Sequence, residues 1–389
     1  MSLSGANFRH FAGVCGAIAL IGACSPDLGS KRGGAGGRVQ VAISGEDIAR
    51  DGISFPTGSE VTLVDGWEVE LSHVLVTVAG VTLAENPDLV PTDQSRTGSV
   101  VATAAGPWAI DLHAPGMIPA AGGEGLATPL TFIENQTERG GAPFAHDERY
   151  AFGYDVVPAS ADATLVNFGD DAEAQAAYAE MIDAGATVLY VGTATFRGLD
   201  CQTSNGAYDF GQFPEKVPFR LAFQTPTSFL NCQNQDNQGS AFEDEEYQRG
   251  VAVPVNGNAL AQITLHLEHV WFSATVHDPT LRFDPLAARL VDQPEGRVVT
   301  LDDAIGVDPT AFTDAAGAPL PFRNCDGSAL PSGKQLRFDN GSVPVDPGAS
   351  PQNALRDYRD FIQYVQSTQG HLNGGEGLCF VERRYPSPR

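Results

Sequence analysis

The chain is short of positive charge. It contains 23 Lys and Arg residues against 48 Asp and Glu residues, which gives a formal net charge of −25. A chain with this balance repels nucleic acid and anionic lipid headgroups, so nucleic-acid binding is excluded. Charged residues are also sparse, at 18%, whereas glycine (43) and proline (26) are abundant. This composition favours an exported β-protein with many turns over a helical protein.

Common catalytic and metal-binding motifs are absent from the sequence. It has no HExxH motif, no CxxC pair, no EF-hand spacing of acidic residues and no GxSxG nucleophile elbow. Acidic residues are numerous, but nothing selects a pair with the arrangement that glycoside hydrolysis requires. The sequence therefore favours a binding protein over an enzyme. A periplasmic hydrolase is an alternative, and it would need a nucleophile or an acid pair in a cleft.

Long apolar runs are missing except near the start of the chain. The run at residues 11–23 has the length of a signal-peptide core and is too short to span a bilayer. It ends in Ile21-Gly22-Ala23-Cys24, which resembles the lipobox of bacterial lipoproteins. The resemblance implies that residues 1–23 are a signal peptide and that Cys24 carries the lipid anchor. A plain secretory signal with an unrelated cysteine is the alternative.

The same resemblance implies where the protein is held. Ser25, rather than Asp, follows the lipid-bearing cysteine, which implies the outer membrane, facing the periplasm or the cell surface. Residues 24–37 are rich in glycine and small polar residues, which predicts a flexible tether. Residues 38–389 form the globular part, either undivided or subdivided near 165–187. We expect membrane association through the lipid and an outer-membrane or periplasmic protein partner.

Four cysteines remain once Cys15 leaves with the signal peptide and the lipobox cysteine takes its lipid. They are Cys201, Cys232, Cys325 and Cys379, an even number in an exported chain, which predicts two disulfides. Three pairings are open. We favour Cys201–Cys232 and Cys325–Cys379, because each closes a local loop. Zinc binding by these cysteines is less favoured, since no two are close in sequence.

Short alternating segments predict a mainly β fold. Residues 38–44 alternate apolar and polar side chains, and residues 58–85 contain strands separated by turn residues. These patterns predict an antiparallel, sandwich-like core. Peripheral helices are expected at three places, from capping residues or an amphipathic stripe: 170–185, 284–291 and 352–369.

Histidine is scarce, with 8 in the chain, yet three lie in the stretch LHLEHVWFSATVHD at residues 265–278. The run of β-branched and aromatic residues predicts a strand. A strand places His266 and Glu268 together on one face and His269 on the opposite, core-facing side. His277 follows the strand and can join the pair if the next turn folds back.

Other histidines are candidate partners for this stretch. His113 stands near Asp111 at a strand end, His73 lies on the inward face of a strand, and Asp278 can orient an imidazole. Two or three imidazoles with one carboxylate suit Zn²⁺ or Cu²⁺. Ca²⁺ is less favoured, although acidic and amide-rich loops supply oxygens. The candidate metal ligands are His266, Glu268, His277, His113, His73 and His269.

These observations predict a membrane-anchored extracytoplasmic lipoprotein that binds Cu or Zn through histidines and a carboxylate. The metal interpretation requires three candidate ligands to approach within about 5 Å of one another. If they do not, the histidines belong to a structural hydrogen-bond network. The alternative function is a carbohydrate- or protein-binding β-sandwich module with exposed aromatic residues such as Trp271 and Tyr247.

Overall fold

The computed structural model describes most of the chain after Ala35. The described ranges are 36–56, 61–123, 125–238, 247–276, 279–375 and 377–384. The described residues make one compact unit. The expected signal peptide, Cys24, most of the tether, His277 and Asp278 lie outside the described residues. None of the described helices is long and apolar enough to cross a membrane.

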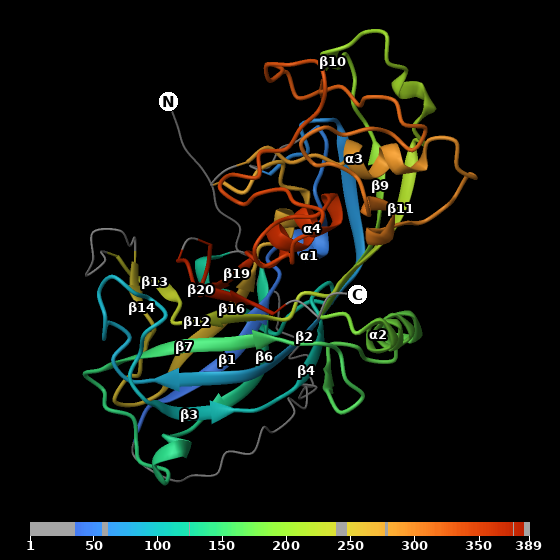
Figure 1. The fold of residues 1–389 in the computed structure, drawn as a ribbon. Coiled ribbons are helices and arrows are strands. Elements are labelled where there is room, and N and C mark those ends of the chain that lie inside the picture. The colour runs from blue at the N-terminus through green and yellow to red at the C-terminus, as the bar shows by residue number, and fades with distance from the viewer. Residues whose placement is uncertain are drawn as a thin grey trace, which may run out of the picture. The chain divides into compact units, whose positions relative to one another are not determined.

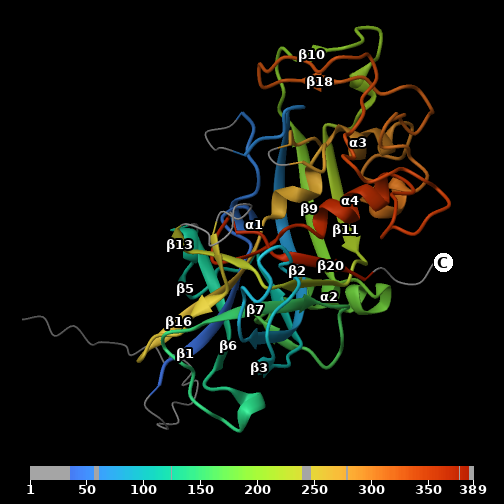
Figure 2. The same ribbon diagram turned by 60° about the vertical axis from the view of Figure 1, so that its left-hand side comes forward.

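The larger sheet is organised around β2, an 18-residue strand (Figures 1 and 2). The first half of β2 pairs with β9, and its second half pairs with β7, β3 and β4. The sheet has eleven strands in the order β17-β11-β9-β2-β7-β12-β20, with β3, β4, β8 and β15 attached. They are β2 (Trp67–Ala84), β3 (Val100–Ala104), β4 (Trp108–Asp111), β7 (Arg149–Val156), β8 (Thr164–Val166), β9 (Val188–Phe196), β11 (Lys216–Phe223), β12 (Thr227–Leu230), β15 (Val251–Ala252), β17 (Val299–Thr300) and β20 (Phe380–Arg383).

A second sheet of five strands has the order β19-β16-β1-β6-β5. Strand β1 pairs in parallel with β16 and antiparallel with β6. The strands are β1 (Arg38–Ser44), β5 (Ile118–Pro119), β6 (Leu126–Ile133), β16 (Asn258–Leu265) and β19 (Gly370–Leu372). Two short pairs complete the strands: β10 (Gln202–Thr203) with β18 (Arg323–Asn324), and β13 (Gln233–Gln238) with β14 (Tyr247–Arg249).

The two large sheets share one hydrophobic core. Alternation along β1 buries Val41 and Ile43, and these residues belong to the same core cluster as Val78 and Leu83 of β2 and Phe152 of β7. Most strand pairs in the two sheets are antiparallel. The predicted mainly β, antiparallel fold with a sandwich-like core is therefore confirmed.

Short helices lie outside these sheets, as predicted. Helix α2 begins after Asp171, whose carboxylate accepts bonds from two backbone N–H groups, and ends at Gly185 with a left-handed φ of 63°. The helices are α1 (Ile48–Asp51), α2 (Ala172–Ala184), α3 (Asp284–Ala287) and α4 (Tyr358–Gln366). The 3-10 helices are η1 (Ala121–Gly123), η2 (Thr137–Arg139), η3 (Phe210–Gln212), η4 (Leu267–Trp271), η5 (Ala288–Leu290) and η6 (Leu301–Ala304).

Two predicted helices are shorter than expected. The prediction for 352–369 contracts to α4, because Leu355 pairs with the segment around Val345 and Asp357 caps the helix. The predicted helix at 284–291 divides into α3 and η5, with Phe283 as the cap and Asp284 as the first helical residue. In both cases, residues that local patterns assign to the start of a helix make tertiary contacts instead.

The four cysteines form two disulfides, but the favoured local pairing was wrong. The bonds are Cys201–Cys325 and Cys232–Cys379. Antiparallel pairing of Gln202 with Asn324 places the neighbouring cysteines opposite each other. The pairing of β12 with β20 brings the segments that contain Cys232 and Cys379 close together. Strand pairing across more than a hundred residues thus decides the connectivity, with sequence separations of 124 and 147.

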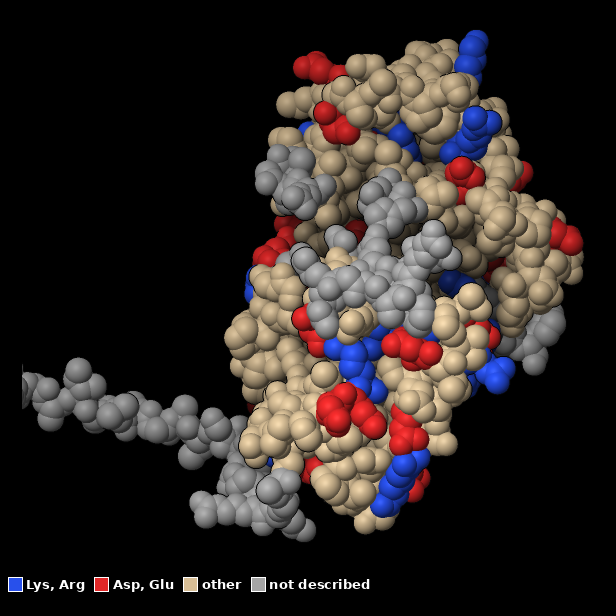
Figure 3. Space-filling view, turned by 90° about the vertical axis from the view of Figure 1, so that its left-hand side faces the viewer, with Lys and Arg blue, Asp and Glu red and all other residues tan. Residues whose placement is uncertain are grey.

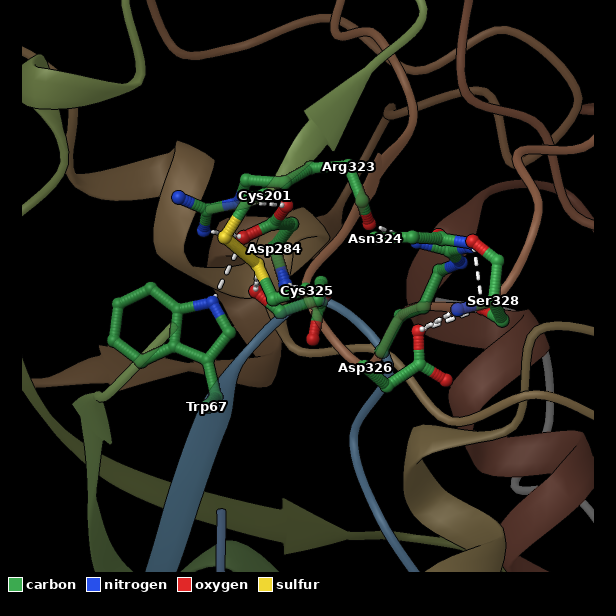
Figure 4. Close-up of a disulfide and its surroundings, with 10 residues drawn as sticks. Trp67, Cys201, Asp284, Arg323, Asn324, Cys325, Asp326 and Ser328 are labelled. Carbon is green, nitrogen blue, oxygen red and sulfur yellow. Dashed lines mark hydrogen bonds and ion pairs between the residues drawn. A yellow bond between two sulfur atoms is a disulfide. The ribbon is translucent and has the colours of Figure 1, made fainter. Parts of the chain in front are cut away.

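A buried ion pair lies beside the first disulfide (Figure 4). The guanidinium of Arg323 donates two hydrogen bonds to the carboxylate of Asp284, which also accepts one from Trp67 Nε1 at 2.8 Å. Arg323 also lies over the rings of Phe196 and Phe210, at 4.2 and 4.3 Å from their centroids. Every charged group of this pair is therefore hydrogen-bonded or stacked, as a buried ion pair requires.

A second buried carboxylate adjoins this pair. Asp65 is fully buried, and its Oδ2 accepts hydrogen bonds from the backbone N–H groups of Phe283 and Asp284, at 2.8 and 2.7 Å. Burial, with the charge of Asp284, raises the pKa of Asp65 to about 7, against the opposing charges of Arg282 and Arg323. The protonation of Asp65 is thus coupled to folding near neutral pH.

Candidate metal centre

The histidine-rich stretch does not continue as a strand. Strand β16 ends at Leu265, and the chain turns at once into the 3-10 helix η4. This turn buries Leu267, Val270 and Trp271, at the i, i+3, i+4 spacing of a helical face. The predicted continuation of the strand through residues 266–271 was wrong, because core packing of these three residues overrides the local β propensity. Strand alternation therefore does not separate His269 from His266.

The turn brings three of the candidate ligands together. His266, Glu268 and His269 each offer one ligand atom, and these atoms all lie within 4.8 Å of one another. The Nδ1 atom of His266 is 3.4 Å from Glu268 Oε1. Tetrahedral ligands that bind one zinc ion at about 2 Å lie roughly 3.3 Å apart, so small side-chain rotations would complete the site. The three residues meet the distance condition that the metal interpretation requires.

His269 is held in the form that a metal ligand needs. The hydroxyl of Thr368 donates to the backbone carbonyl of Val365 at 2.7 Å, so it must accept the 2.8 Å bond from His269 Nδ1. The proton of the imidazole therefore sits on Nδ1, and Nε2 keeps its lone pair. Burial lowers the pKa of His269 to about 4, against the opposing charge of Glu268, so the ring is neutral at pH 7.

Glu268 is the carboxylate of the group. Burial alone would raise its pKa, but a hydrogen bond and the charge of His266, with the charge of His269, lower the pKa overall. The side chain is therefore ionised at neutral pH. Its Oε2 atom is buried and has no hydrogen-bond partner among the described residues. An ionised oxygen in this state is costly to bury, and a bound cation would compensate it.

Strand register brings two further residues to the site. Ser44 of β1 is paired with Thr264 of β16. Glu46 and His266 each follow two positions later in the chain, just past the ends of these strands, and lie side by side. Their Oε2 and Nδ1 atoms are 3.3 Å apart. Glu46 adopts a φ of 56°, a left-handed conformation that non-glycine residues rarely occupy. Such strain is often found at functional sites.

His371 enters from the other side of β16. Thr264 is paired with His371 of β19, and the rings of His371 and His266 meet edge to face with centroids 4.4 Å apart. The Nδ1 of His371 donates to the carbonyl of Gly377 at 3.0 Å. Burial, with the charges of His266 and His269, lowers the pKa of His371 well below its usual value. His371 flanks the three-residue group as a neutral imidazole.

Sequence reasoning missed both Glu46 and His371. They lie about 220 residues before and 105 residues after His266 in the chain, and nothing in their immediate neighbourhood marks either of them. Only the pairing of β1 and β19 with β16 brings them to it. Alternation along a strand indicates which of its faces is buried, but it does not indicate which distant strand pairs with it or in what register.

The predicted partners His113 and His73 belong to a different place. Their rings contact each other with centroids 6.4 Å apart, and neither belongs to the three-ligand group. His73 Nδ1 bonds the carboxylate of Asp111 at 2.8 Å, and His113 Nδ1 donates to the carbonyl of Ala49 at 2.9 Å. The expectation that they join His266 was wrong, because strands β2 and β4 hold them in their own network. Whether His277 joins the group stays a prediction.

Trp271 does not support the alternative of a carbohydrate- or protein-binding surface. Trp271 is 1% exposed, and its ring packs with Tyr190 and Phe219 in the core. The 3-10 helix that carries it contacts α4 and α1 (Figure 1). Trp271 therefore cannot serve as a platform for a carbohydrate or a protein partner.

No protein-family model, curated protein or solved structure matches this chain.

Proposed function

We propose that this protein binds a single transition-metal ion, Zn²⁺ or Cu²⁺, through His266, Glu268 and His269. The observation that carries the proposal is the approach of the three ligand atoms to within 4.8 Å of one another. The orientation of His269 by Thr368 and the unpartnered Oε2 of Glu268 support it. Two imidazoles and one carboxylate are a ligand set that both ions accept.

The ligand set also argues for a binding or transfer role. Three protein ligands leave a position of a tetrahedral ion open to water or an exchanging ligand. The side chains of His266 and Glu268 are 14% and 15% exposed, so the edge of the site borders solvent. Capture and release of a metal need this combination of partial burial and an open position. Ca²⁺ is a weaker candidate, because it prefers oxygen ligands alone.

We also propose that the protein is an outer-membrane lipoprotein anchored through Cys24. The support is the lipobox-like Ile21-Gly22-Ala23-Cys24 and the two disulfides, which are typical of proteins that fold in an oxidising compartment. Mass spectrometry of the mature protein isolated from membranes tests this. A lipid-modified Cys24 at the N-terminus is expected, and an unmodified chain that begins elsewhere would contradict the anchor.

Elemental analysis and calorimetry test metal binding. Residues 25–389, purified without metal and then dialysed against one equivalent of Zn²⁺ or Cu²⁺, should retain one ion per chain. His269→Ala and Glu268→Gln should each weaken binding by about tenfold or more, because each removes one of three ligands. His146→Ala is the matched control, since His146 is exposed and lies outside the group.

The outcome separates the metal site from a structural network. A wild-type chain that retains no ion above background would contradict the proposal. So would equal affinity in the His269→Ala and His146→Ala variants. In either case the histidines and carboxylates would be a hydrogen-bond network.

A further inference from the structure

A cavity of about 330 Å³ lies between helices α2 and α4 and strands β9 and β11, away from the histidines. Its apolar lining includes Met181 of α2, Leu189 of β9 and Leu301 of η6. Its polar lining includes Arg220 of β11 and Arg359 of α4. The volume is at the small end of the range of ligand sites, which is about 300–1,000 Å³.

Arg359 is the unusual residue of this cavity. Its side chain is 12% exposed, yet its guanidinium makes no hydrogen bond with any described residue. Its Nε atom is fully buried and unpartnered. The nearest carboxylate oxygen, Asp302 Oδ1, is 3.6 Å from Nη1, which is too far for a hydrogen bond, and Asp302 is 79% exposed. A buried N–H donor without a partner is costly, and the Nε of Arg359 is such a donor.

The other buried arginines among the described residues donate hydrogen bonds, although the Nε of Arg289 is also without a partner. Arg323 makes its double bond with Asp284, and Arg282 donates to the carbonyl of Arg323 at 2.8 Å and to Asn324 Oδ1 at 2.7 Å. On the face drawn in Figure 3, basic side chains likewise lie beside acidic ones. Arg359 differs from these arginines because its guanidinium donates no hydrogen bond to a described residue and has only the 3.6 Å ion pair with Asp302. Its place on a cavity wall points to a further anionic partner.

Two more donors face the same cavity. Gln363 lies one helical turn after Arg359 on α4, on the same side of the helix. Arg220 Nη2 and Nε both donate to Glu180 Oε2, at 2.6 and 3.1 Å, and Glu180 is 60% exposed. An exposed ion pair of this kind is worth little and can be exchanged for another anion. Two guanidinium groups thus converge on one cavity in a chain that is strongly acidic overall.

We propose that this cavity binds a small organic monocarboxylate, with its carboxylate on Arg359 and its apolar part against Met181, Leu189 and Leu301. A carboxylate matches the planar fork of a guanidinium and can take two bonds from it. The apolar wall favours a ligand with a hydrocarbon or aromatic body over an inorganic anion. The acidic rim residues Glu180 and Asp302 disfavour a dianion such as phosphate, because like charges repel.

Calorimetric titration of residues 25–389 with benzoate and hexanoate tests the proposal. The protein is first freed of metal with a chelator and the chelator is removed, because a carboxylate can also coordinate a metal ion. Benzoate or hexanoate should bind at one site per chain. Hexanol and inorganic phosphate should bind about tenfold more weakly or not at all, since neither combines a single charge with an apolar body.

Arginine variants test whether the carboxylate binds in this cavity. Arg359→Gln should weaken carboxylate binding by about tenfold or more, through loss of a charge-assisted hydrogen bond. Arg139→Gln is the matched control, since Arg139 is 45% exposed and pairs with Glu85 outside the cavity. Thermal melting checks that each variant folds, and Arg220→Gln takes the place of Arg359→Gln if that variant does not.

Three results would overturn the proposal. One is that neither carboxylate binds the wild-type chain. Another is that phosphate binds as tightly as the carboxylates. The third is that a folded cavity variant, Arg359→Gln or its replacement Arg220→Gln, binds them as tightly as Arg139→Gln does. None of these results bears on metal binding, which is measured separately at the histidines.

Discussion

Replacing Thr368 by valine would test how the metal site is prepared. Thr368 is not a ligand in the proposed site. Its hydroxyl accepts a hydrogen bond from His269 Nδ1–H at 2.8 Å and donates one to the carbonyl of Val365. Valine has nearly the same shape and neither function. The imidazole then either leaves Nδ1–H unpartnered in a buried position or moves its proton to Nε2, the atom that would bind the ion.

The size of the effect follows from these two outcomes. Loss of a partner that orients a metal-bound histidine typically weakens metal binding by about 10–100-fold. An unpartnered buried N–H also costs about 1–3 kcal/mol in folding free energy. The carbonyl of Val365 adds little to this cost, because it still accepts the backbone N–H of Thr368 at 3.0 Å. We therefore expect a large loss of affinity with a modest loss of stability.

The assay is a competition titration with a chromophoric zinc chelator, with denaturant unfolding of the metal-free chain alongside. Thr368→Ser is the control, because serine keeps the hydroxyl and should keep wild-type affinity. If Thr368→Val and Thr368→Ser bind Zn²⁺ equally tightly, the orientation of His269 by Thr368 does not prepare the site and the reasoning is refuted.

Two further predictions concern stability. The folded-state pKa of Asp65, about 7, exceeds the unfolded value of about 3.9, so between these pH values the folded chain binds more protons and stability falls as pH rises. The difference in unfolding free energy between wild type and Asp65→Asn, measured with denaturant, should fall by up to about 1.4 kcal/mol per pH unit over this range. Asp162→Asn, at an exposed position, is the matched control for the loss of one carboxylate. Replacing both Cys201 and Cys325 by serine should lower the unfolding free energy by about 2–5 kcal/mol. Unchanged unfolding midpoints would show that this bond does not contribute to stability.

Local patterns predicted part of the candidate site. The concentration of histidine at 265–278 is enough to mark His266, Glu268 and His269 as candidate ligands. The arrangement assigned to them was wrong, because the stretch forms a 3-10 turn whose apolar residues pack into the core. Glu46 and His371 were not predicted, since each reaches the site by strand pairing with distant parts of the chain.

By itself, the sequence determined the elements whose signals are short-ranged. Alternation with period two predicted the strands, and the acid cap and Gly185 predicted α2 nearly to its ends. Cysteine number also predicted two disulfides. These features follow from interactions among residues a few positions apart, or from counting, so the linear chain contains the information needed.

Tertiary structure alone decided which distant residues meet. Pairing or packing between remote segments decides the partner of each cysteine, the approach of Glu46 and His371 to His266, and the position of Arg359 at a cavity. Alternation along a strand indicates which of its faces is buried, but it does not indicate which distant strand pairs with it or in what register. Only the folded chain, in which burial and hydrogen bonding are satisfied together, selects these contacts.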